Sequence, residues 1–65
     1  MSQVESFGND IYQHILNQYG KTMLSRIQAS KHKTLVSKLI DSASNQNDTV
    51  EHAANKIIAM LRMNP

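Results

Sequence analysis

The 65-residue sequence contains no cysteine and no tryptophan, and it has only one proline and two glycines. Without cysteine the chain has no disulfide, no thiolate zinc site and no cysteine nucleophile, so a fold this small depends on helix packing or on a partner. The single proline is Pro65, and no segment alternates polar and apolar residues, which makes a β-sheet hard to place. Helices are therefore the expected element.

Long apolar runs and targeting signals are also missing. The longest apolar run, Ile57–Leu61, is far shorter than the roughly 20 residues of a membrane helix. The first residues have neither the basic nor the apolar character of a secretion signal. Together with the lack of cysteine, this predicts a cytoplasmic protein without a membrane partner. A composition of 40% hydrophobic and 18% charged residues is typical of one globular domain, here residues 1–65.

The spacing of apolar residues predicts an all-α fold, a compact bundle of three to four short helices. The expected helices cover residues 3–18, 22–29, 32–44 and 49–62. A break is required near Ser30, because Met23, Leu24 and Ile27 would lie about 220° around a continuous helix from the apolar residues of 35–43.

Polar residues and a glycine mark the expected helix ends. Ser2 and Asp48, each followed three residues later by a glutamate, have the form of capping boxes. Ser30 is the candidate N-cap of the third helix, and Gly20 stands where the first helix would end in a left-handed conformation. The polar stretch 44–47 predicts a loop before the last helix.

The apolar arcs of the first, third and last expected helices span roughly 140° to 180°, wider than the 100° or so that a core-facing helix needs. Each of these three helices is thus expected to touch two neighbours or an outside partner, and a homodimer would supply further burial. Gly8 lies within the first arc, where it either admits a close neighbour or is simply tolerated. Tyr12 and Tyr19, at the edge of that arc, are candidate anchors for a protein partner; the alternative is that they cap the rim of the core.

The sequence contains no motif typical of catalysis. The three histidines lack the spacing of metal ligands, no Gly-x-Ser-x-Gly elbow is present, and the five acidic residues include no evident catalytic pair. Asp10 with His14 and Asp48 with His52 are better interpreted as surface pairs four residues apart. We therefore expect a protein that is not an enzyme and has no metal and no cofactor.

Positive charge is concentrated in the middle of the sequence. Residues 11–40 contain no Asp or Glu and carry Lys21, Arg26, Lys31, Lys33 and Lys38. His32 lies between two of these lysines, in the expected first turn of the third helix, where the helix dipole disfavours cations. A phosphate there would meet backbone N–H groups and three side-chain donors. These six residues are the candidate set for binding an anion or nucleic acid, and a merely solvated basic face is the alternative.

The short helix, turn and longer helix also have the outline of a helix-turn-helix DNA-binding unit. In that arrangement Lys33, Thr34, Ser37 and Lys38 would face the groove. The usual glycine is absent from the turn, and arginine, the preferred base-reading residue, occurs once in the segment.

Two functions follow as hypotheses. The first is a small regulatory or adaptor protein that binds a protein partner, or a second copy of itself, through an apolar helix surface flanked by basic residues. The alternative is a regulator that binds DNA or RNA through the basic segment 21–38.

Overall fold

The computed structural model describes the backbone of residues 3–63 and the side chains from residue 6 onward within that range. It contains four helices: α1 (Gln3–Tyr19), α2 (Lys21–Ile27), α3 (Ser30–Asn45) and α4 (Val50–Met63). No strand occurs in residues 3–63. The all-α bundle expected from the sequence is confirmed, with every helix end within two residues of its predicted position.

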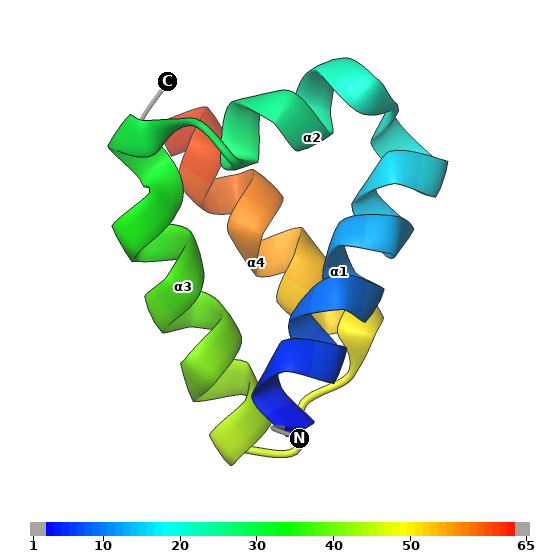
Figure 1. Ribbon diagram of the computed structural model, residues 1–65, viewed down its shortest axis with the longest axis vertical. Coiled ribbons are helices and arrows are strands. Elements are labelled where there is room, and N and C mark those ends of the chain that lie inside the picture. The colour runs from blue at the N-terminus through cyan, green and yellow to red at the C-terminus, as the bar shows by residue number, and fades with distance from the viewer. Residues whose placement is uncertain (1–2, 64–65) are drawn as a thin grey trace.

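The helices enclose one hydrophobic core (Figure 1). α1 packs against the other three helices, and α3 packs against α2 and α4 as well. The core consists of Ile11, Ile15, Ile27, Val36, Ile40, Ala43, Ala53, Ala54, Ile57, Ile58 and Leu61. Because each long helix faces two or three neighbours, the wide apolar arcs are covered within one chain. The arcs alone therefore give no reason to expect a homodimer.

The break between α2 and α3 is made by one residue. Gln28 keeps a helical conformation and its N–H bonds the Leu24 carbonyl, whereas Ala29 is extended, with φ −63° and ψ 147°. Ser30 is already helical, so the N-cap position belongs to Ala29 and no side chain caps α3. The predicted change of direction is confirmed, but the assignment of Ser30 as the cap is wrong.

Gly20 joins α1 to α2 with a φ of 94°, a value that favours glycine. Its N–H donates to the Leu16 carbonyl at the end of α1, and its own carbonyl accepts the Leu24 N–H at the start of α2. The positive φ expected here is confirmed. The ψ of 175° is extended, however, so the residue does not have the left-handed helical conformation that the sequence suggested.

The corner between α3 and α4 is also built by single residues. Asn47 has a φ of 54°, and the N–H groups of Asn47 and Asp48 donate to the carbonyls of Ser44 and Ala43, which is the Schellman motif. The Thr49 hydroxyl accepts the His52 backbone N–H at 3.1 Å and so caps α4. The loop covers residues 46–49, so it has the predicted length but lies two residues later than expected, and the cap is Thr49, not Asp48. The other predicted cap, Ser2, lies outside the described residues.

Two predictions within the apolar arcs need comment. Leu35, expected in the core, is 44% exposed, because it lies past the edge of the buried face of α3. Gly8 is buried in α1 opposite Ile40 of α3, and an added Cβ would lie 3.7 Å from the Ile40 side chain, an ordinary contact distance. The close neighbour is therefore a side chain with room to spare, not a helix backbone.

Candidate functional site

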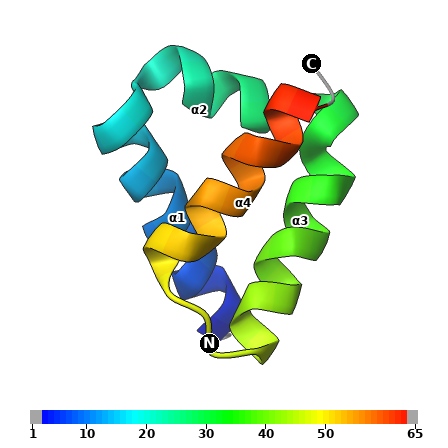
Figure 2. The same cartoon turned by 180° about the vertical axis from the view of Figure 1, so that it is seen from behind.

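Five of the seven Lys and Arg residues lie at one end of the bundle. α2 connects the end of α1 to the start of α3, and the end of α4 reaches the start of α3 in both views (Figures 1 and 2). We call this region the basic end, defined by Lys21, Arg26, Lys31, Lys33 and Arg62. Residues 11–40 and 52–65, which supply it, contain no Asp or Glu.

The acidic residues lie elsewhere. They are Glu5 and Asp10 in the first half of α1, Asp41 in the last part of α3, Asp48 in the following loop and Glu51 in the first turn of α4. The start of α1, the end of α3 and this loop lie together, away from α2 (Figure 2). The fold therefore places most of the cations away from the acidic residues; the exceptions are Lys56, which is paired with Asp48, and Lys38, which lies midway along α3. Arg62 was not among the predicted cations, because only the fold brings the last turn of α4 to the start of α3.

The side chains of the basic end are available to a ligand. All five are exposed, as is Lys38 farther along α3. The ion pairs of the described side chains involve only Asp48, His52 and Lys56, so none of these six cations has an acidic partner there. A run of unpaired cations raises the local positive potential and attracts polyanions.

His32 does not share the surface with its lysine neighbours. It is 4% exposed and belongs to the buried face of α3, at four-residue spacing with Val36 and Ile40. Lys31 and Lys33 leave the helix about 160° apart, because successive residues turn by 100°. The three side chains therefore cannot converge on one phosphate as the sequence suggested. The spacing of His32 with Val36 was the signal for its burial.

The two candidate tyrosines differ in exposure. Tyr12 is half-buried and packs against the core, which is the rim-capping alternative. Tyr19, in the last turn of α1, is 39% exposed and lies at the basic end. Its side chain makes no hydrogen bond or ring contact with the described residues. The two tyrosines therefore do not form the single anchor that their spacing suggested: Tyr12 packs against the core, whereas Tyr19 is exposed.

A second cluster of charges lies at the α3–α4 corner. The His52 Nδ1 donates to both carboxylate oxygens of Asp48, at 2.7 and 2.8 Å, which confirms the predicted pair. The Thr49 N–H also donates to this carboxylate, and the Lys56 Nζ lies 3.5 Å from it. Asp10 and His14 form no such pair. The hydrogen bond from His52 holds the pKa of the Asp48 carboxyl below its ordinary 3.8, and the Thr49 N–H and the two nearby cations act in the same direction against partial desolvation.

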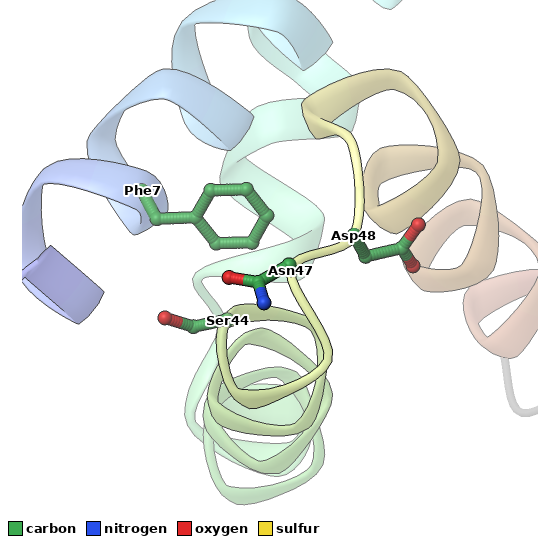
Figure 3. Close-up of a pocket in the computed structure, with 4 residues that line it drawn as sticks. All are labelled: Phe7, Ser44, Asn47 and Asp48. Atoms are coloured by element: carbon green, nitrogen blue, oxygen red, sulfur yellow. The ribbon is translucent and has the colours of Figure 1, made fainter.

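An open pocket of about 240 Å³ adjoins this corner, lined by Phe7, Ser44, Asn47 and Asp48. The Phe7 ring points toward the loop, whereas the Asp48 carboxylate points away from Phe7 toward α4 (Figure 3). The carboxylate is thus engaged by His52 and does not face the pocket. Ligand pockets are commonly 300 to 1,000 Å³, roughly, and lined mostly by apolar groups, so this one offers little for a small molecule.

The described residues supply neither a metal centre nor a membrane span. No three His, Asp or Glu side chains among them lie close enough together to hold a metal ion. None of the four described helices is both long and apolar enough to cross a bilayer. Comparison of the chain with protein-family models, with curated proteins and with solved structures finds no match.

Proposed function

We propose that this protein binds nucleic acid, without catalysis, through the phosphate contacts of its basic end. The observation that supports the proposal is the separation of charge by the fold: five exposed cations from three helices share one end, and the acidic residues lie elsewhere. Phosphate contacts from Lys and Arg supply most of the affinity in nucleic-acid binding. α3 also starts there without a side-chain cap and with two lysines in its first turn, an arrangement that an anion would stabilise.

The burial pattern favours nucleic acid over the protein partner that was the first hypothesis. A protein partner was expected because the apolar arcs exceeded what one bundle needs, yet the bundle itself covers them. The exposed large hydrophobic residues among the described side chains are Tyr19, Leu35 and Met63. The five cations of the basic end, by contrast, are exposed and have no acidic partner among the described side chains.

The helix-turn-helix arrangement receives mixed support. Its four candidate groove residues, Lys33, Thr34, Ser37 and Lys38, are all exposed. Asp41, also exposed, falls in the middle of the same arc of α3, one turn after Ser37. A carboxylate there would repel phosphate, so contact is limited to the first turns of α3.

Salt dependence tests the proposal. Fluorescence anisotropy with a labelled oligonucleotide should show affinity falling steeply between about 50 and 200 mM salt, with the slope reduced by about one unit in Lys31→Ala or Lys33→Ala. Lys56→Ala is the matched control, because it removes the same charge from a lysine already paired with Asp48. Equal slopes in all three variants, or no binding at low salt, would contradict the proposal.

One observation keeps a protein partner as a second candidate. Leu35 is exposed on α3, with Lys31 one turn before it and Lys38 one turn after it. An acidic amphipathic segment would match this surface. Binding of such a partner should weaken in Leu35→Ala, whereas nucleic-acid binding should tolerate Leu35→Ala.

A further inference from the structure

Tyr19 is the exposed aromatic residue of the described chain. The sequence has three aromatic residues in all, and the other two, Phe7 and Tyr12, pack against the core. Tyr19 is 39% exposed, and its ring touches no other ring. An exposed aromatic ring that has no ring partner is able to stack against a flat ligand.

Tyr19 lies at the basic end, close in the chain to two of its cations. Tyr19 ends α1 and Lys21 begins α2, and the positive φ of Gly20 makes the turn between them. α2 has seven residues and is thus about 10 Å long, with Lys21 at one end and Arg26 near the other. The start of α3, with Lys31 and Lys33, follows after two residues. Tyr19 and these four cations therefore share one end of the bundle.

We propose that the basic end takes single-stranded nucleic acid, with one base stacked on Tyr19 and the adjoining phosphates held by Lys21 and Arg26. This inference rests on the proposed function and names the form of nucleic acid that the site selects. Proteins that bind single strands combine a basic surface for the backbone with aromatic side chains for the bases. In a duplex the base faces are already stacked, so Tyr19 would find nothing to stack on.

The geometry of α3 points the same way. If this face of α3 lay in a duplex groove, the exposed Asp41 carboxylate would come close to the phosphate backbone and be repelled by it. A single strand lying along α2 would not reach Asp41, which is three turns into α3.

Binding of two oligonucleotides tests the inference. A single strand of about 12 nucleotides should bind more tightly than a duplex of equal length, measured by fluorescence anisotropy. Tyr19→Leu should weaken single-strand binding about 5-fold or more, the equivalent of one lost stacking contact, without changing the salt slope. Tyr19→Phe should keep the wild-type affinity, because it retains the ring. Circular dichroism should show equal helix content in all three proteins.

Tyrosine emission gives a readout that does not depend on affinity. The chain has no tryptophan and two tyrosines, so in Tyr19→Phe the emission comes from Tyr12 alone. Saturation with the single strand should quench the wild-type protein and leave the variant nearly unchanged. Oligonucleotide binding that does not quench the wild type, or that is insensitive to Tyr19→Leu, would overturn the stacking site while leaving the proposed function intact. If the protein bound neither oligonucleotide, both the stacking site and the proposed function would be overturned.

Discussion

Gly8 and Gly20 show how differently one residue type acts in two backbone conformations. Gly8 lies inside α1 with space beside it, so Gly8→Ala should raise the free energy of unfolding by about 0.5 to 1 kcal/mol through helix propensity and contact with Ile40. Gly20 has a φ of 94°, so Gly20→Ala should lower it by about 1 to 3 kcal/mol, although nothing lies within 4 Å of the added methyl. Urea denaturation measures both; a destabilised Gly8→Ala would show that the α1–α3 contact is tighter than described.

Asp48 makes the free energy of unfolding depend on pH in the acidic range. Because the folded-state pKa of Asp48 is lowered, its contribution is fully present above its ordinary pKa of 3.8 and is lost as the pH falls through the lower folded value. In Asp48→Asn the free energy of unfolding should vary less between about pH 5 and pH 2 than in the wild type. Urea denaturation across this range would detect the difference. An unchanged pH profile would mean that the contacts from His52 and Thr49 do not favour the carboxylate.

At the residue scale, the sequence predicted the features that depend only on residue type or on spacing along the chain. The Asp48–His52 pair followed from a separation of four residues, and the positive φ of Gly20 from residue type. The burial of His32 was not predicted, although its four-residue spacing with Val36 signalled it. The exposure of Leu35 did not follow from the sequence, because Leu35 lies past the edge of the buried face of α3. The positions of neighbouring helices decide which edge is covered, and spacing within one helix cannot supply them.

At the scale of elements, the α3–α4 corner depends on one cap. Thr49→Ala removes the acceptor of the His52 N–H and should lower the free energy of unfolding by about 1 kcal/mol. Thr49→Ser keeps the hydroxyl and should cost much less. If chemical denaturation showed the two variants to be equally destabilised, the hydrogen bond would not be the source of the loss.

The four helices were predictable because their apolar periodicity is strong and the change of direction near Ser30 excludes one continuous helix. The N-cap residues of α3 and α4 were not predictable from the sequence. Ala29 has no polar side chain and caps α3 only through its extended backbone, which residue type does not reveal. At α4 the sequence offers Asp48 and Thr49 side by side, and only the geometry shows that Thr49 caps the helix while Asp48 binds His52 and Lys56.

At the scale of the whole molecule, the main property is the separation of charge. The sequence shows that segment 11–40 has no acidic residue, but it does not show where the cations of this segment lie on the surface. If they were spread evenly, they would form only a solvated basic face. In the folded chain, α2 instead lies across one end of the bundle, and the last turn of α4 adds Arg62 to the cations there. Arg62 also lies in the last turn of its helix, where the helix dipole favours a cation. Part of the basic end is thus stabilised by the fold, whereas Lys31 and Lys33 at the start of α3 are not.

Mapping of backbone amide chemical shifts by NMR during titration with an oligonucleotide tests the central claim most directly, because it locates contact without changing the protein. The account predicts that shifts concentrate at residues 19–33 and 60–63, with residues 44–52 of the α3–α4 corner unaffected. Shifts centred on that corner, or spread evenly over the chain, would contradict it.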